Sequence, residues 1–365
     1  MKKLFDFVIG NPPFQESRTT TKDMPVYNYF MDGAESVSSH SLLITPGRFL
    51  FDAGATPKAW NKKKLHDKHF KILSYNPKSE TIFPSTDIKG GVVISYQSDL
   101  GNYGEIGTFT PFEELNLILR KVNNKSISTM RMDSIMVPYS AYNFSNELWN
   151  DFPEKKKEIE YISKNRNSLS KEEKDGKLSN LRIITTNIFE LFPEIFFDSI
   201  PDSQEYVQLV GRKKGERCKK YVLKKYINVG CNYSKWKVIV PKSNGSGALG
   251  ETLSTPMLGT PMLGTPMLGY TQTFLGIGSF ETKAEAEACM KYVKTKFART
   301  MLGVLKRTQD NPPEKWKYVP LQNFTSNSDI DWSKSVAEID QRLYKKYWLD
   351  EKEIDFIESH VKEMN

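Results

Sequence analysis

The chain has 365 residues and a mass of 41.9 kDa, a length that accommodates two domains. Hydrophobic residues make up 38% and aromatic residues 12% of the sequence, which excludes a wholly disordered chain. The net charge of +8 and the pI of about 9.0 favour a polyanionic partner, although charge alone does not identify nucleic acid. No apolar run approaches the roughly 18 residues of a membrane span, and Asp6 and two prolines interrupt the first residues, unlike a signal peptide. We therefore expect a cytoplasmic protein with no membrane partner.

Cysteine and histidine are too sparse to suggest a metal centre. The three cysteines, Cys218, Cys231 and Cys289, lie far apart, and no pair is spaced as CxxC. His66 and His69 are close together, but no cysteine or third ligand lies near them. The sequence predicts neither a disulfide framework nor a bound metal.

Apolar runs and turn residues alternate over the first hundred residues. Strands are predicted at 4–9, 41–45, 70–75 and 90–97, and helices at 25–37 and 59–67. Strands separated by helices indicate an α/β fold with a mostly parallel sheet. The last strands lie close together, with no room for a helix after Gln97, so an antiparallel pair is expected at that edge.

The pattern changes after residue 110. Residues 111–122 are predicted to form a helix, and the highly charged stretch at 154–177 is interpreted as a solvated helix or a mobile linker. Residues 255–269 contain three consecutive copies of the pentapeptide TPMLG. Because each copy has a proline and a glycine, and three copies are too short for a solenoid, the repeat is predicted to be a surface loop without chemistry.

Residues 205–226 combine eight basic with two acidic side chains, a net charge of +6 within 22 residues, and three tyrosines are interleaved with them. In a nucleic-acid groove such cations would meet phosphates, and the rings would pack or stack. A surface hairpin with ordinary strand tyrosines explains the same pattern equally well. The candidate DNA-binding residues are Arg212, Lys213, Lys214, Arg217, Lys219 and Lys220.

The strongest functional signal is Asn11-Pro12-Pro13-Phe14, directly after the first predicted strand. Open α/β sheets bind their ligands at the carboxyl ends of strands. Asn11 and Pro12 each precede a proline, which makes the loop stiff. The loop therefore presents one amide, one carbonyl and one aromatic ring in a fixed arrangement. A rigid turn with a buried Phe14 is the alternative interpretation.

These three groups suit the exocyclic amino group of a purine. The side-chain oxygen of Asn11 and the carbonyl oxygen of Pro12 can accept its two hydrogens, which favours a tetrahedral nitrogen able to attack a methyl group. Phe14 can stack on a base that has been flipped out of a duplex. The candidate catalytic residues are Asn11, Pro12, Pro13 and Phe14.

A second Asn-Pro-Pro sequence, at 311–313, provides a control. It follows polar residues rather than a predicted strand, and Glu314 takes the place of the aromatic residue. It is predicted to be a turn.

The segment FDFVIGNPPF resembles motif IV of the gamma-class N6-adenine DNA methyltransferases of bacterial restriction–modification systems. SLLITPGRFL looks like the next strand of that family, and IFPSTDIKGGVVISY looks like its motif VIII strand, with Asp87 to Gly91 at the edge of the site. Four later segments resemble the distal, target-recognition part of the family: WKVIVPKSNGSGALGE, AEAEACMKYVKTKFAR, KYVPLQNF and LYKKYWLDEKEIDFIE. The resemblance implies three regions: a partial Rossmann-like methyltransferase sheet at 1–110, a helical, charged connecting region at 111–204, and an α+β target-recognition and C-terminal region at 205–365.

The resemblance also implies S-adenosylmethionine as methyl donor and double-stranded DNA as substrate. The glycine-rich cofactor loop of the family precedes motif IV, yet only ten residues precede Asn11, and the glycines at 247–250 and 276–278 stand in the wrong context. We therefore expect the C-terminal part of a split or truncated enzyme, whose cofactor-binding residues are unknown and whose cofactor-binding half is supplied by a separate chain. The isolated chain should bind S-adenosylmethionine weakly.

Two further expectations concern partners and activity. No PD-(D/E)xK signature is recognisable, so DNA cleavage by this chain is not predicted. The resemblance to restriction–modification enzymes implies a cognate restriction endonuclease as a partner. The alternative to a methyltransferase is a DNA-binding remnant or specificity subunit that transfers no methyl group of its own.

Overall fold

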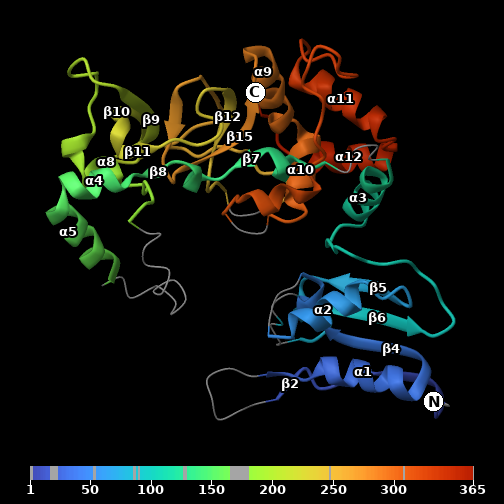
Figure 1. Ribbon diagram of the computed structural model, residues 1–365. Coiled ribbons are helices and arrows are strands. Elements are labelled where there is room, and N and C mark those ends of the chain that lie inside the picture. The colour runs from blue at the N-terminus through green and yellow to red at the C-terminus, as the bar shows by residue number, and fades with distance from the viewer. Residues whose placement is uncertain are drawn as a thin grey trace. The chain divides into compact units, whose positions relative to one another are not determined.

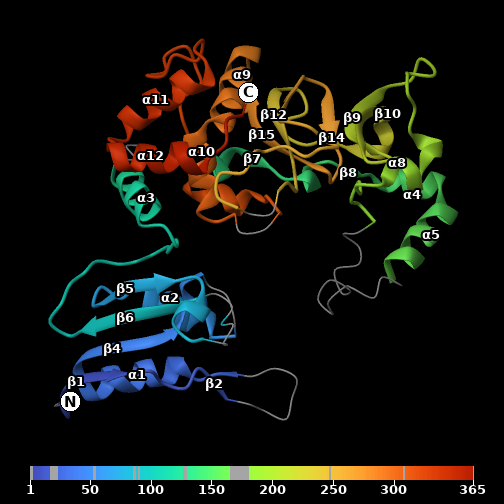
Figure 2. The ribbon, with the colours of Figure 1, turned by 180° about the vertical axis from the view of Figure 1, so that it is seen from behind.

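The computed structural model describes residues 3–16, 24–51, 55–84, 88, 91–125, 130–164, 181–245, 248–306 and 309–364. The chain divides into two compact units, residues 1–116 and 117–365, and each is described by itself (Figure 1, and Figure 2 from behind). Within the described ranges, no helix combines the length and the apolar character needed to cross a membrane.

A four-stranded sheet with the order β1-β4-β6-β5 forms the centre of the first unit. The strands are β1 (Phe5–Gly10), β4 (Ser38–Pro46), β5 (Phe70–Asn76) and β6 (Val92–Ser98). β1 and β4 are parallel, whereas β6 is antiparallel to both β4 and β5. The expected antiparallel pair at that edge is confirmed, and β1, β4 and β5 run in one direction, but β6 also pairs antiparallel with β4, which the sequence did not predict.

The connection between β5 and β6 explains this difference. Its described residues form a 3-10 helix, η2 (Ser79–Thr81), and no α-helix. A parallel pair needs a crossover of roughly a dozen residues or more, usually an α-helix. Without that helix the chain reverses, and β6 returns antiparallel between β4 and β5.

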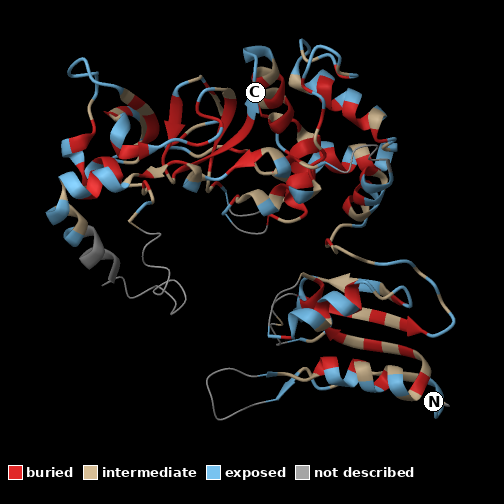
Figure 3. Ribbon diagram, in the orientation of Figure 1, coloured by how far each residue is buried: buried red, intermediate tan, exposed pale blue. Residues whose placement is uncertain are grey.

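Helices cover one face of this sheet. They are α1 (Tyr27–Val37), the 3-10 helix η1 (Gly47–Phe51) and α2 (Lys58–Leu65). α1 buries Tyr27, Met31 and Ala34, which recur at helical spacing, and Figure 3 shows the buried residues of α1 as red bands along the helix. The same core contains Phe49 of η1 and Phe70 of β5. A short antiparallel pair, β2 (Gln15–Glu16) with β3 (Met24–Pro25), lies between β1 and α1 in the sequence.

The described residues of the second unit form three small sheets. The first has the order β10-β9-β14 and consists of β9 (Tyr206–Lys213), β10 (Glu216–Leu223) and β14 (Leu268–Tyr270). The second has the order β13-β12-β15-β7 and consists of β7 (Met136–Val137), β12 (Trp236–Pro241), β13 (Met262–Gly264) and β15 (Phe274–Phe280). The third pairs β8 (Asn143–Phe144) with β11 (Ile227–Asn228).

The remaining described elements of the second unit are helices. The α-helices are α3 (Glu113–Lys125), which runs across the division between the units, α4 (Asn146–Asp151), α5 (Pro153–Lys164), α8 (Ile188–Leu191), α9 (Lys283–Lys294), α10 (Lys296–Gly303), α11 (Val336–Lys346) and α12 (Glu351–His360). The 3-10 helices are η3 (Met132–Ile135), η4 (Tyr139–Ala141), η5 (Pro193–Ile195), η6 (Lys224–Tyr226) and η7 (Pro313–Tyr318). α9, α11 and α12 each begin with a capping box, which satisfies two backbone N–H groups at the first turn.

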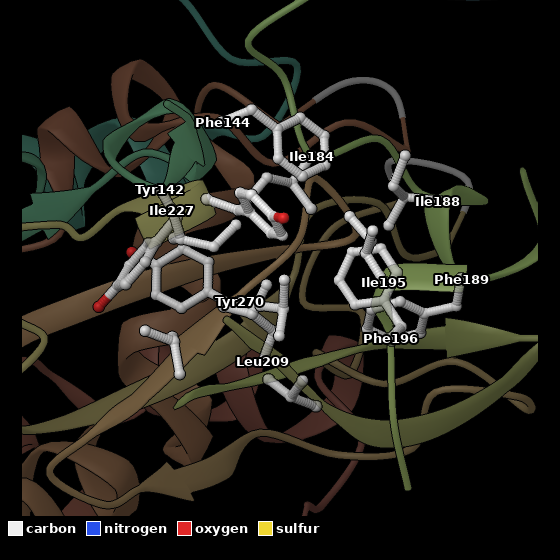
Figure 4. Close-up of a cluster of buried hydrophobic side chains, with 14 of the residues drawn as sticks. Tyr142, Phe144, Ile184, Ile188, Phe189, Ile195, Phe196, Leu209, Ile227 and Tyr270 are labelled. Atoms are coloured by element: carbon white, nitrogen blue, oxygen red, sulfur yellow. The ribbon is translucent and has the colours of Figure 1, made fainter. Parts of the chain in front are cut away.

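Residues from 142 to 196 contribute to the core of the second unit, although the sequence suggested a connecting region at 111–204. Figure 4 shows Tyr142, Phe144, Phe189 and Phe196 packed with Leu209 and residues of the neighbouring sheets. Large aromatic side chains dominate the free energy of burial. The described parts of this segment therefore belong to a folded core. Residues 165–177 of the charged stretch lie outside the described residues.

The three TPMLG copies adopt three different structures, so the prediction of a plain surface loop is wrong. The first copy, 255–259, closes on itself through the backbone hydrogen bonds between Thr255 and Gly259. The second copy supplies β13, and the third supplies the first two residues of β14. Leu258 and Leu268, equivalent residues of the first and third copies, are both in the hydrophobic core.

Candidate functional site

The Asn-Pro-Pro-Phe loop begins where β1 ends. β1 is held against β4 over its whole length, from Phe5 opposite Ser38 to Gly10 opposite Leu43. Asn11 follows Gly10 directly and is exposed, as is Pro13, whereas Pro12 and Phe14 are half-buried. The carbonyl oxygen of Phe14 accepts a hydrogen bond of 3.2 Å from the backbone N–H of Val26. The loop is therefore anchored on both sides and presents Asn11 outward.

An open groove of about 440 Å3 lies beside this loop. Its walls come from the end of β1, the start of the loop, α1 and β4, and its lining residues are Val8, Gly10, Asn11, Pro12, Tyr29, Phe30, Gly33, Ala34, Val37 and Leu43. Most of these side chains are apolar. Asn11 and Tyr29 are the lining residues with polar side-chain groups, so the groove suits a largely apolar molecule with a few hydrogen-bonding groups.

Phe14 has a second ring beside it. The centroid of the Phe83 ring lies 5.9 Å from that of Phe14, and the two planes meet at 78°, an edge-to-face arrangement. Phe83 comes from the segment after η2, about 70 residues away in the sequence. No local sequence pattern indicates which distant ring packs against Phe14, so the sequence alone assigned Phe83 no role.

The predicted edge of the site at Asp87 to Gly91 is only partly within the described residues. Asp87 and Gly90 lie outside them. Gly91 has φ of +70°, and an added Cβ would lie 2.4 Å from the carbonyl oxygen of Asn76, so glycine is required there. The Gly91 carbonyl oxygen accepts a hydrogen bond of 2.9 Å from Gly47, which ties the start of β6 to the end of β4.

The second Asn-Pro-Pro segment is placed quite differently. Asn311 is fully buried, and its backbone N–H donates to the carbonyl oxygen of Lys242 at 2.8 Å. Within the described part of the chain, neither side-chain polar atom of Asn311 has a hydrogen-bond partner. Pro313 begins η7, so the chain turns into a 3-10 helix as predicted for a turn.

The basic stretch at 205–226 forms the hairpin β9–β10. Lys214 and Gly215 make its tight turn, with φ of 50° and 90°. Positive φ at both turn positions is the arrangement that matches the twist of the two strands. Lys213, Lys214 and Lys219 are exposed. These three ammonium groups are accessible to phosphates.

The other three candidate DNA-binding residues are less available. Lys220 is buried and forms an ion pair with Asp198, and this hydrogen bond lowers the pKa of the Asp198 carboxyl. Arg217 donates to the carbonyl oxygen of Thr260 at 2.7 Å, and burial lowers the pKa of its guanidinium. Arg212 is half-buried and lies directly opposite Arg217 across the hairpin. The hairpin therefore divides into exposed lysines and partly buried cations.

The described residues of the groove do not by themselves fit S-adenosylmethionine. The methyl donor carries a ribose and a charged amino acid, and the groove lining contains no carboxylate to bind either. The glycines at 276 and 278 lie within β15, where an added Cβ would lie 2.5 Å from Tyr270 and 2.1 Å from Phe280. Gly250 packs against Val361 in the same way. These glycines serve close packing and do not form a phosphate- or cofactor-binding loop.

The described residues contain no recognisable metal-binding site either. No group of three or more histidine, cysteine, aspartate or glutamate side chains is gathered there as metal ligands would be. Cys218, Cys231 and Cys289 all carry free thiols, and Cys289 is buried, which raises its pKa.

The first unit thus places the exposed Asn11 and the Phe14–Phe83 ring pair at and just after the carboxyl end of β1. A family model described as Eco57I restriction-modification methylase matches residues 1–83. This match supports a restriction-modification methylase family for that segment and suggests a DNA methyltransferase. No curated protein matches the chain.

Proposed function

We propose that the chain acts in site-specific methylation of adenine N6 in double-stranded DNA and supplies the base-binding part of the active site. The arrangement around Asn11 is the observation that carries this proposal. An exposed amide and the Pro12 carbonyl stand at the open end of β1, with the groove on one side and the Phe14–Phe83 ring pair beside them. The match of residues 1–83 to a restriction-modification methylase agrees with it.

The oxygens of Asn11 and Pro12 can compensate for the poor nucleophilicity of the N6 amino group of adenine. The lone pair of the N6 amino group is delocalised into the ring. The Asn11 side-chain oxygen and the Pro12 carbonyl oxygen accept its two hydrogens and favour a tetrahedral nitrogen whose lone pair is free to react. Because Pro12 and Pro13 restrict the loop before the base arrives, little reorganisation is needed during the reaction.

The rings account for capture of the base. An adenine inside a duplex cannot reach the loop, so it must be flipped out of the stack. Phe14 would stack on the flipped base, and Phe83 would hold the Phe14 ring in position through its edge-to-face contact of 5.9 Å. Phe83 thereby joins Asn11, Pro12, Pro13 and Phe14 in the proposed site.

The methyl donor is S-adenosylmethionine, and a second polypeptide would complete its binding site. This part of the proposal follows from the groove, whose described lining lacks partners for the ribose and the amino acid of the donor. The exposed lysines of the β9–β10 hairpin would contact DNA phosphates.

Nucleoside analysis of cellular DNA tests the proposal. The chain and the product of the adjacent reading frame would be expressed in a host without adenine methyltransferases, and the DNA would be digested to nucleosides for mass spectrometry. N6-methyldeoxyadenosine is expected with the wild-type chain and is expected to disappear with Asn11→Ala. N4-methyldeoxycytidine in its place would contradict the adenine assignment. DNA binding without any methylated base would favour the remnant or specificity subunit.

A further inference from the structure

The three methionines of the TPMLG repeat lie in different environments, although their local sequences are identical. Met262, in the second copy, packs against the hydrophobic core. Met257 of the first copy and Met267 of the third are 56% and 54% exposed. Single exposed apolar side chains are common, so exposure alone gives neither methionine a role. Their surroundings distinguish Met257 from Met267.

Met257 belongs to a turn that is fixed in place. The backbones of Thr255 and Gly259 close the first copy with hydrogen bonds of 2.9 and 3.3 Å. The Thr255 hydroxyl accepts a further hydrogen bond of 2.7 Å from the backbone N–H of Leu258, whose side chain is in the hydrophobic core. The exposed side chain of Met257 is therefore next to an anchored residue on a closed turn.

The tip of the β9–β10 hairpin lies against this turn. The sulfur atom of Met257 would be 2.9 Å from a Cβ added to Gly215, so Met257 packs on the tip where glycine leaves room for it. The guanidinium of Arg217 donates a hydrogen bond of 2.7 Å to the carbonyl oxygen of Thr260, the residue after the first copy. The first copy and the hairpin tip therefore form one continuous surface.

The hairpin tip is positively charged. Residues 212–219 contain five basic side chains and one acidic side chain, that of Glu216. The carboxylate of Glu190 also lies at the tip, because it accepts a hydrogen bond from the backbone N–H of Lys214. Five cations against two carboxylates leave a net charge of +3 at the tip. The apolar side chain of Met257 therefore stands in a surface that attracts polyanions.

Met267 lies toward the other end of the same hairpin. It directly precedes β14, whose Leu268 is in register with Gln208 of β9, and Gln208 comes five residues before Lys213. At about 3.3 Å per residue, these two positions are about 17 Å apart along the strand. Met267 therefore shares the exposure and the pentapeptide of Met257 but not the charged tip.

We propose that Met257 inserts between two adjacent base pairs of duplex DNA, while the cations of the hairpin tip contact the flanking phosphates. Proteins that kink DNA insert apolar side chains, methionine among them, in this way, and the insertion unstacks one base step and bends the duplex. Methionine suits this contact because its unbranched side chain adapts to irregular apolar surroundings. The proposal rests on the proposed function for its substrate, double-stranded DNA, and assigns the first repeat copy a part in distorting it.

The test measures bending of a short duplex that carries a fluorescent donor and acceptor at its two ends. The full-length chain with Phe14→Ala is titrated into it, so that capture of a flipped base does not contribute. Binding should raise energy transfer. Adding Met257→Ala should abolish that rise and increase the Kd about 5- to 30-fold through lost apolar burial. The slope of log K against log salt should stay the same, because no charge is removed.

Two further variants serve as controls. Met257→Leu keeps an apolar side chain at the tip and should retain the bend, so its recovery separates insertion from a general loss of structure. Met267→Ala removes an equally exposed methionine from an identical pentapeptide. It should retain the bend and change the Kd less than about twofold.

Each contrary result has a definite meaning. A bend that survives Met257→Ala, or that Met267→Ala weakens equally, would overturn the proposal. A bend that is present in the wild-type chain but lost with Phe14→Ala would assign the distortion to base flipping, which overturns the insertion of Met257 and supports the proposed function. A bend that depends on Met257, in a chain that yields no methylated adenine under any condition tested, would count against the proposed function alone.

Discussion

Two segments of this molecule share the sequence Asn-Pro-Pro, and the structure treats them in opposite ways. Asn11 is exposed at the end of a parallel-paired strand, beside an open groove and a pair of rings. Asn311 is fully buried, precedes a 3-10 helix and has a glutamate, Glu314, in place of the aromatic residue. The prolines stiffen both segments equally. Stiffness alone therefore does not distinguish the two segments; the strand before Asn11 and the ring after it do.

The largest expected effect is on the rate of methyl transfer, which Asn11→Ala should lower and Asn311→Ala should not. Asn11→Ala removes one acceptor for the amino hydrogens of adenine, and loss of such a preorganised contact costs about 3 to 4 kcal/mol in the transition state. Methyl transfer, followed with radiolabelled S-adenosylmethionine, should fall about 100- to 1,000-fold. Asn311→Ala should leave transfer per folded molecule unchanged.

A variant that restores the tetrapeptide in the second segment sharpens this test. Glu314→Phe, placed in the Asn11→Ala background, creates a second Asn-Pro-Pro-Phe sequence without the strand or the groove. It should not recover methylation. Recovery would mean that the tetrapeptide alone suffices and would contradict the lesson of the comparison.

The rings carry the next largest effect. Phe14→Ala should weaken capture of the flipped adenine by about 1 to 3 kcal/mol, the usual value of one stacking contact. Phe83→Ala should have a smaller effect in the same direction, because Phe83 acts by positioning Phe14. Fluorescence of 2-aminopurine in place of the target adenine reports the flipped fraction. Phe14→Tyr keeps the ring and should retain flipping; a loss as large as with alanine would argue against stacking.

The buried side chain of Asn311 predicts that one substitution stabilises the protein. The Asn311 side chain has no hydrogen-bond partner among the described residues, and an unsatisfied buried polar group costs about 1 to 3 kcal/mol. Asn311→Leu has a similar volume and should raise the free energy of unfolding by about 1 kcal/mol in urea titrations. A marked loss of stability would show that the amide is satisfied, for example by buried water.

The smallest effect concerns DNA affinity and depends on exposed charge. Replacing Lys213, Lys214 and Lys219 with alanine should reduce the slope of log K against log salt by about 0.9 for each lost phosphate contact. Lys220 is kept, because its removal would leave Asp198 without its partner.

A second triple variant provides the control for that charge change. Lys345, Lys352 and Lys362 are also exposed, and replacing them with alanine removes the same charge elsewhere. An equal flattening by the two variants would show that the hairpin is not the DNA-contacting surface.

Local patterns in the sequence were sufficient to predict the elements of the first unit. β1, α1 and β5 lie within two residues of their predicted ranges, because apolar periodicity and glycine or proline boundaries are encoded locally. The direction of strand pairing was not predicted well, since it depends on whether a crossover helix forms. Of the proposed site, the sequence indicated Asn11 to Phe14, and that assignment stays a prediction. Phe83 was missed because its contact with Phe14 spans about 70 residues of sequence.

The sequence also did not reveal which charged side chains are buried. Lys219 and Lys220 are neighbours of the same type, yet one is exposed and the other is buried beside Asp198. Alternation along β10 decides which of them faces the core, and a shift of one residue in register would exchange them. The position of the turn at Lys214 and Gly215 fixes that register.

The number of TPMLG copies in the coding sequence affects how the second unit folds. Tandem repeats in DNA gain and lose whole units by slippage during replication, so this chain can be inherited with one copy more or fewer. Since the three copies are identical, deletion of any of them yields the same protein, which must then form a closed turn, β13 and β14 from two copies. Lys237 donates hydrogen bonds of 3.0 Å to the carbonyl oxygens of Thr265 and Leu268, so the third copy also has a fixed attachment. Loss of one copy is therefore expected to lower the stability of the second unit, and a length polymorphism here would act as a heritable change in that stability.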